Sequence, residues 1–323
     1  MEQEAIFSQV IILGIVGLIG VIAAKAKVIS SVVNDSLAGI IINITAPFMI
    51  ISSLSGLEFT DLIIKNSLWV FVFSYMAIFV LMGLGFLSFK ILGLKEDLGK
   101  VHVLHTTYGN IVFLGFPVIN ELFPGGEALL YAGIYQVASN SIMWTWAVYY
   151  LRKDKNQSFG SNLKKLANPN TIALVLGLLI MAFQIRLPFV LQKSMGGLGN
   201  TTLYLAMLYI GGLLASIKLL DSVKNLHVWI LSLNKLVLGP FIVLLIIQAI
   251  ISLTGLHLGY IALTVVVLEA AMPCMVIIII LVKKYGGDEK SAIGNLFLTT
   301  VLSFITLPLV NYLIKCTITF FTE

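Results

Sequence analysis

Charge is scarce in this sequence. Of its 323 residues, 59% are hydrophobic and only 11% are charged, whereas about a quarter of an ordinary soluble domain is charged. The mean hydropathy is +1.03. This composition argues against a soluble domain and is typical of a protein that crosses a membrane several times.

Other absences exclude several classes of function. The two cysteines, Cys274 and Cys316, lie in or beside apolar runs, so we expect them to act as small hydrophobic residues. No spacing of histidine, cysteine and acidic residues resembles a metal site. There is no phosphate-binding loop, dinucleotide fingerprint or pair of nucleophile and base, so we expect neither an enzyme nor a cofactor. The net charge of +5 comes from scattered basic residues, which gives no reason to expect nucleic acid.

Long apolar runs fill most of the chain. A run of about 18 residues or more without charge can cross a bilayer. The boundary between the eighth and ninth runs rests on the turn residues Thr254 to His257. The ten runs are 5–24, 36–57, 67–89, 101–120, 128–151, 166–185, 196–217, 228–254, 258–282 and 291–314.

Basic residues lie mainly on one side of these expected spans. Fifteen lysines and arginines fall in the loops after spans one, three, five, seven and nine, and four fall in the opposite loops and the C-terminal tail. Basic residues accumulate in cytoplasmic loops. We therefore expect both termini outside the cell, with loops 25–35 and 152–168 in the cytoplasm.

The hydrophilic loop 152–168 divides the chain into two halves of five spans, 1–151 and 169–323. Because five is odd, the second half must cross in the opposite sense, as in the inverted repeats of many secondary transporters. Pro117 and Pro273 each lie in the fourth span of their half. Proline breaks helical hydrogen bonds, and a broken helix at mid-membrane typically lines a binding site. The sequence predicts that proline-broken helices four and nine cross at the midplane; two ordinary kinks are the alternative.

Three amide side chains inside the spans are candidates for the binding site. Asn110 is near mid-membrane beside Gly109, where its amide could bind a carboxylate or join two helices. Gln136 and Asn140 are four residues apart on one helix face, and they either line a cavity or join helices.

One acidic and one basic side chain lie well inside spans. An ionised Glu269 at that depth would cost about 3 kcal/mol or more, so it should be paired or protonated. Lys235, in the preceding span, is a candidate partner. A structural ion pair and a carboxyl that couples proton movement to transport are both compatible with this pattern.

The motifs along nearly the whole chain resemble the auxin efflux carrier family, which includes plant PIN proteins and bacterial malate and malonate permeases. The segments that carry the resemblance are Asn43–Pro47, Tyr108–Asn110, Leu114–Pro117, Tyr131–Gln136, Asn140, Asn168–Pro169, Gly211–Ala215, Ala271–Pro273 and Leu307–Pro308.

The resemblance implies an all-α membrane protein with ten transmembrane helices in two inverted repeats of five, similar to bile-acid transporters and sodium–proton antiporters. Helices 1, 2, 6 and 7 would form a scaffold, and helices 3–5 and 8–10 a transport domain that moves as an elevator. In the plant members the asparagine corresponding to Asn110 contacts substrate. Asn43, Thr45 and Pro47 would border the site from the scaffold. The chain lacks the long central hydrophilic loop of the plant exporters.

These observations predict a secondary active or facilitative transporter of a small organic anion, either a malate-like carboxylate or an auxin-like acid. A receptor or signalling scaffold that kept a transporter fold without flux is the alternative. The expected partners are the lipid bilayer, a small carboxylate and protons. The expected location is the plasma membrane, here the bacterial inner membrane, and whether the protein is a monomer or a homodimer stays open.

Overall fold

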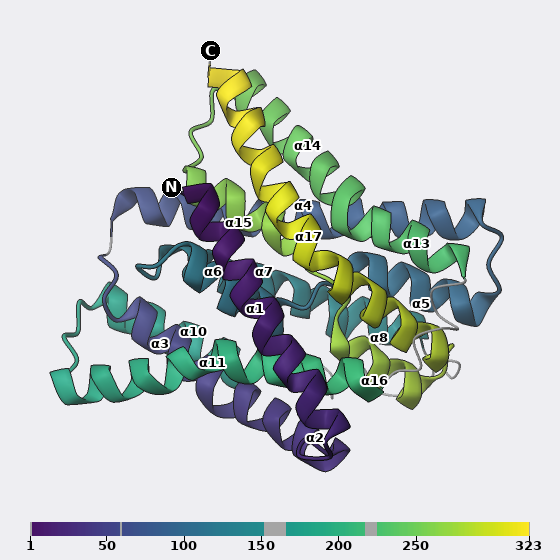
Figure 1. The fold of residues 1–323 in the computed structure, drawn as a ribbon. Coiled ribbons are helices and arrows are strands. Elements are labelled where there is room, and N and C mark those ends of the chain that lie inside the picture. Colours follow the sequence, from purple (N-terminus) through teal and green to yellow (C-terminus); the bar gives the residue numbers. More distant parts are fainter. Residues whose placement is uncertain (1, 59, 152–165, 217–224, 323) are drawn as a thin grey trace. The chain divides into compact units, whose positions relative to one another are not determined.

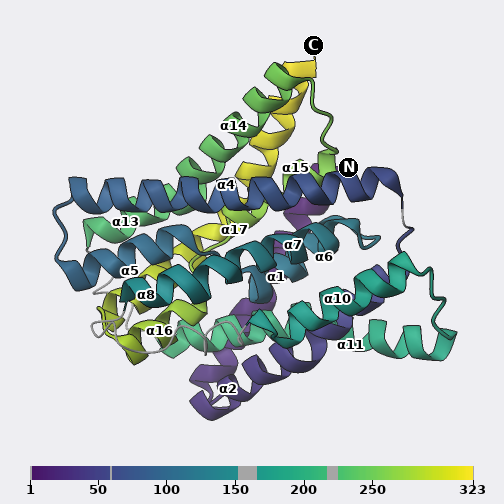
Figure 2. The same ribbon diagram turned by 180° about the vertical axis from the view of Figure 1, so that it is seen from behind.

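The computed structural model describes residues 2–58, 60–151, 166–216 and 225–322 (Figures 1 and 2). Each expected span is helical over most of its described residues. Five helical stretches are long and apolar enough to cross a membrane, and shorter apolar helices accompany them. The expected cytoplasmic loop 152–168 lies outside the described residues except for 166–168.

The chain forms two compact units. Unit 1 comprises residues 1–69, 111–136 and 167–216, and unit 2 comprises residues 70–110, 137–166 and 217–323. Helices α4 (Asp61–Ile91) and α7 (Glu127–Ile142) run through the boundary, so each contributes to both units.

In unit 1, the helix α11 (Phe189–Ser216) is central, and it contacts most of the other elements. The other elements of unit 1 are α1 (Glu2–Lys25), α2 (Ser31–Ile40), the π-helical turn η1 (Ile41–Thr45), α3 (Ala46–Leu54), the π-helical turn η2 (Ile111–Gly115), α6 (Phe116–Leu122) and α10 (Pro169–Ala182), which packs on α3.

Glycines allow α1 and α11 to approach closely. A Cβ atom on Gly20 would lie 2.7 Å from the carbonyl oxygen of Leu208, and one on Gly211 would collide with the carbonyl oxygen of Gly17. Small residues serve this purpose between membrane helices, where backbone contact replaces the hydrophobic driving force.

In unit 2, the helix α17 (Glu289–Thr322) is central and contacts α5, α13, η5, α14, α15 and α16. In both views α14 (green) runs beside α17 (yellow) (Figures 1 and 2). The bounds are α5 (Glu96–Thr107), η3 (Met143–Ala147), α8 (Val148–Leu151), α13 (Leu226–Leu233), η5 (Asn234–Leu238), α14 (Gly239–Thr254), α15 (Tyr260–Ala270) and α16 (Val276–Tyr285).

The expected boundary between spans eight and nine is confirmed. The helix α14 ends at Thr254, and Gly255 follows in the left-handed region with φ of +67°. Glycine reaches this conformation without steric cost, which is why it commonly ends helices.

Large apolar side chains are exposed along several helices. Examples are Leu18 and Ile22 of α1, Leu68 and Phe79 of α4, and Ile305 of α17. In water such a surface would aggregate, whereas in a bilayer it faces lipid tails. The exposed apolar surface and the apolar helices together describe a multi-pass membrane protein.

Three π-helical turns each end one residue before an Xaa-Pro pair. Pro47 follows η1, Pro117 follows η2 and Pro240 follows η5. At the end of η1 the N–H of Ala46 bonds to the carbonyl of Ile41, five residues earlier, and Gly239 bonds to Asn234 in the same way after η5. Each proline then occupies the first turn of a new α-helix, where its missing N–H removes no helical hydrogen bond.

The helix containing Pro117 is broken, but not where the sequence led us to expect. The break lies at Tyr108–Asn110, and Pro117 sits in the first turn of α6. In the second half the break spans residues 271–275 and does contain Pro273. The expectation of a proline at both breaks is therefore wrong for the first half, because the π-helical turn η2 accommodates Pro117 within the helix.

Candidate functional site

The two helix breaks meet within unit 2 and pair as a short antiparallel bridge. The N–H of Asn110 donates to the carbonyl of Pro273 over 2.8 Å, and the N–H of Met275 donates to that of Tyr108 over 3.2 Å. Gly109 and Cys274 form the bridge between them. These bonds satisfy buried backbone groups that the breaks release.

Gly109 makes this close crossing feasible. A Cβ atom at this position would lie 3.0 Å from the Cβ of Met272 and 3.1 Å from the carbonyl oxygen of Glu269. A side chain at this position would require Met272 or the carbonyl of Glu269 to shift by a few tenths of an ångström.

Helix α17 supplies a third support for the crossing. The hydroxyl of Thr299 accepts a hydrogen bond from the N–H of Cys274 over 3.1 Å and donates to the carbonyl of Asn295 over 2.7 Å. The thiol of Cys274 lies 3.5 Å from the carbonyl oxygen of His105 in α5. Cys274 thereby connects the break after α15 to both α5 and α17.

Lys235 and Glu269 are both completely buried beside the crossing. The Nζ of Lys235 donates to the carbonyl of Thr107 over 3.4 Å, so its charge faces the C-terminal end of α5. A cation is stabilised at this end because the helix dipole is negative there.

Neither carboxylate oxygen of Glu269 has a hydrogen-bond partner. Within the described part of the chain, no ion pair joins Glu269 to Lys235. The direct ion pair, one of the two alternatives from the sequence, is therefore not formed in this structure.

Unpaired hydrogen-bond donors gather at the crossing. The Nδ2 of Asn110 is buried without a partner, and so is the hydroxyl of Tyr108. The helix α16 begins just after the bridge with no side-chain cap, and the N–H groups of Val276 and Ile277 precede its first intrahelical bond. Donors and the positive end of a helix dipole together favour an anion at this place.

In unit 1, the predicted scaffold residues have unequal environments. Thr45 and Pro47 are buried, and the hydroxyl of Thr45 has no partner. Asn43 is exposed and its amide donates to the carbonyl of Gly39 in its own helix. Pro117 is buried in α6, and Phe113 of η2 stacks on Tyr209 of α11.

The comparison with known protein families covers residues of both units. A family model described as membrane transport protein matches residues 5–159 and 157–311, which is nearly the whole chain. The chain belongs to this family. It is the auxin efflux carrier family that the sequence motifs indicated. No curated protein matches the chain.

Members of the membrane transport protein family are transporters and not enzymes, and the crossing holds several of the unpaired buried polar groups of the described residues. It brings together Gly109, Asn110, Pro273, Lys235 and Glu269 from the predicted set. Gln136 and Asn140 are both buried, but Gln136 belongs to unit 1 and Asn140 to unit 2.

Sequence reasoning missed the contribution of α17 to this transporter's crossing. Asn295 is completely buried and neither its Oδ1 nor its Nδ2 has a partner, while Thr299 holds Cys274. The signal was present, because Asn295, Thr299 and Ser303 recur every four residues and therefore share one face of an apolar helix. The described residues hold no group of three or more histidine, cysteine or acidic side chains that could bind a metal ion.

Proposed function

We propose that this membrane transport protein carries a small organic anion, a malate-like carboxylate or an auxin-like acid, by secondary active or facilitative transport. The anion binds at the crossing of the two broken helices. The observation that carries the proposal is the set of unpaired donors there, namely the Asn110 amide and the uncapped start of α16. A carboxylate accepts several such bonds at once.

The proposed architecture has ten spans in two inverted repeats, with both termini outside the plasma membrane. The distribution of basic residues supports the orientation. Two helix breaks that pair in antiparallel sense support the inverted repeats, since equivalent helices of such repeats run in opposite directions.

The proposed mechanism is an elevator, in which helices 3–5 and 8–10 move against a scaffold of helices 1, 2, 6 and 7. The division of the chain supports it. Residues 1–57 and 167–216, which contain the proposed scaffold helices, belong to unit 1, and most of the proposed transport domain belongs to unit 2. The stretches 61–69 and 111–136 of the transport domain are exceptions, because they belong to unit 1.

We assign Glu269 as the group that carries a coupled proton. Its carboxyl group is completely buried, has no hydrogen-bond partner and forms no ion pair within the described residues. An ionised carboxylate in that position would be costly, so its occupancy by a proton should change when water or substrate reaches it.

The test is counterflow of radiolabelled malate and of indole-3-acetate in proteoliposomes. The wild-type protein is expected to exchange at least one of them. Asn110→Ala is expected to lose exchange and ligand-dependent thermal stabilisation while its unliganded stability stays unchanged. The control is Asn200→Ala, the same change at an exposed position of α11, which is expected to behave as wild type.

Two outcomes would contradict the proposal. If Asn110→Ala exchanges and binds as the wild type does, the crossing is not the substrate site. If the wild-type protein binds a carboxylate but shows no flux, the protein is a receptor that kept the transporter fold.

A further inference from the structure

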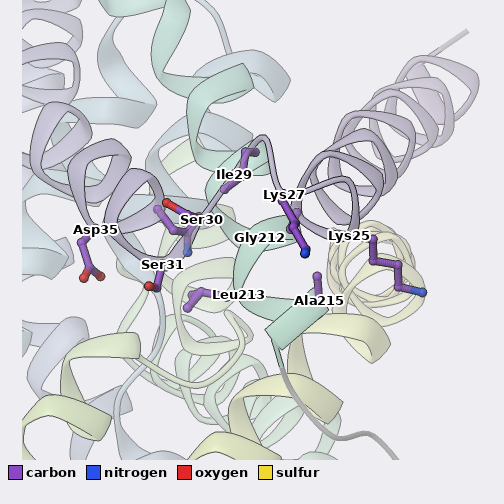
Figure 3. A pocket seen from close by; sticks show the side chains of 11 residues that line it. Lys25, Lys27, Ile29, Ser30, Ser31, Asp35, Gly212, Leu213 and Ala215 are labelled. Carbon is purple, nitrogen blue, oxygen red and sulfur yellow. The ribbon is translucent and has the colours of Figure 1, made fainter.

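A pocket of about 440 Å³ lies in unit 1, and none of its lining residues belongs to the crossing. The end of α1, the start of α2 and the last turns of α11 line it, and the side chains include both charges: Lys25, Lys27 and Asp35. In Figure 3 the side chain of Lys27 extends toward Ala215, whereas that of Lys25 extends away from the other labelled side chains.

Lys27 is held in place by an unusual end of α1. Its φ is +61°, a conformation that side chains rarely adopt. Its N–H bonds to the carbonyl of Ala24, and the N–H of Val28 bonds to that of Ala23. This is the Schellman arrangement, in which the left-handed position is usually glycine. The backbone of Lys27 is thereby held beside the pocket, which its side chain lines.

The start of α2 adds further donors beside Lys27. The side chain of Ser30 accepts a bond from the N–H of Val33 over 3.3 Å, and the first helical bond runs from Asn34 to Ser30. The N–H groups of Ser31 and Val32 therefore lie at a helix N-terminus without an intrahelical acceptor. Together with Lys27 they suit a phosphate oxygen.

The other side of the pocket offers acceptors. Figure 3 shows Asp35 on the far side of Ser30 and Ser31 from Lys27. Asn34 also lines the pocket; only 6% of it is exposed, and its Oδ1 has no hydrogen-bond partner. A Cβ atom on Gly212 would collide with this oxygen, so the glycine provides its room.

Three charged residues line the pocket, and two of them, Lys27 and Asp35, form no ion pair with each other in the described part of the chain. Opposite charges separated across one pocket, with donors near the first and an unpaired acceptor near the second, match a ligand that carries a phosphate and an ammonium group.

Exposed apolar residues stand next to the pocket-lining residues in the sequence. Ile22, Val28 and Val32 are each at least 65% exposed, and α1 ends here after its apolar run. In the proposed topology this end of α1 lies at the cytoplasmic surface of the bilayer, which would bring the pocket to headgroup depth. We infer that it binds the headgroup of phosphatidylethanolamine, with the phosphate on Lys27 and the start of α2 and the ammonium on Asp35 and Asn34.

Native mass spectrometry of the delipidated protein tests this inference with dihexanoyl phosphatidylethanolamine, phosphatidylcholine and phosphatidylglycerol as separate probes. Phosphatidylethanolamine should bind most tightly, because the choline ammonium has no N–H donor and glycerol has no positive charge. Lys27→Gln and Asp35→Asn should each weaken its binding about five- to tenfold. The control Lys90→Gln, at an exposed lysine of α4, should leave it unchanged.

Several results would overturn the inference. Equal binding of the three lipids would show that no zwitterionic headgroup is recognised. Equal affinities of Lys27→Gln and Lys90→Gln would show that the lipid binds elsewhere. Displacement of the lipid by millimolar inorganic phosphate in the wild-type protein, but not in Lys27→Gln, would identify a site for free phosphate.

Discussion

Two neighbouring threonines on α17 allow the hydrogen bond at the helix crossing to be measured. Thr299 and Thr300 are both buried, and each hydroxyl donates to the carbonyl four residues earlier over 2.7 Å. The Thr299 hydroxyl alone also accepts the N–H of Cys274, over 3.1 Å. Thr299→Val and Thr300→Val are therefore the same chemical change with and without the bond to the crossing.

The expected difference follows from the buried N–H that Thr299→Val leaves without an acceptor. Valine has nearly the volume of threonine, so neither variant creates a cavity. Leaving a buried donor unsatisfied costs about 1–3 kcal/mol, whereas losing the intrahelical bond is common to both variants. Local opening of the break around Cys274 should then be roughly 5 to 140 times more frequent in Thr299→Val than in Thr300→Val.

Cys274 itself reports this opening. The chain has two cysteines, and Cys274 is buried while Cys316 is exposed, so Cys316→Ser leaves one buried thiol. When opening is fast relative to labelling, the rate of maleimide labelling follows the population of the open form. Equal labelling rates in the two threonine variants would refute the assignment of Thr299 as a support of the crossing.

Three further predictions concern coupling, topology and packing. Glu269→Gln should remove the effect of an imposed pH gradient on uptake while exchange persists. If Glu269→Gln instead lowers the free energy of unfolding by about 3–5 kcal/mol and Lys235→Met recovers much of this loss, the two residues form a pair. With Cys316→Ser, a cysteine placed at Ser158 should react with an impermeant maleimide only in permeabilised cells, and labelling in intact cells would reverse the topology. Gly211→Ala should lower the free energy of unfolding by about 1–3 kcal/mol, whereas Gly196→Ala, which meets no atom within 4 Å, should not lower the thermal midpoint.

The helical segments and the ends of several of them could be predicted from the sequence. Apolar runs without charge give the segments directly, and Gly255 marks the end of α14 because of its left-handed conformation. The position of the first break could not be predicted in the same way. Pro117 is the residue expected to break the helix, but the π-helical turn η2 accommodates it without a break. The helix breaks at Gly109 instead, where the chain lies close to Met272 and Glu269.

The hydrogen-bond partners of the two buried charged residues also could not be predicted from the sequence. Lys235 and Glu269 stand in successive spans, which makes them candidates for a pair. In the structure Lys235 instead donates a hydrogen bond to the carbonyl of Thr107 at the end of α5. A helix end that exists only because the helix breaks there cannot be recognised from charge spacing.

Lys27 is a similar case. In the sequence it is one of fifteen basic residues that indicate topology, and any of them would serve that purpose equally. Its left-handed backbone and its place in the pocket depend on how α1 ends beside α2, which only the folded chain shows.

The π-helical turns have a consequence for which insertions and deletions this chain can tolerate during evolution. Each turn holds a surplus residue relative to an α-helix, and one residue corresponds to about 100° of helix rotation. Deleting a residue within η2 would restore α-helical bonding, turn the buried face of α6 outward and set Pro117 against a carbonyl of the preceding turn. At η2 the proline therefore depends on the surplus residue, so that a deletion there would be tolerated only together with a substitution of Pro117.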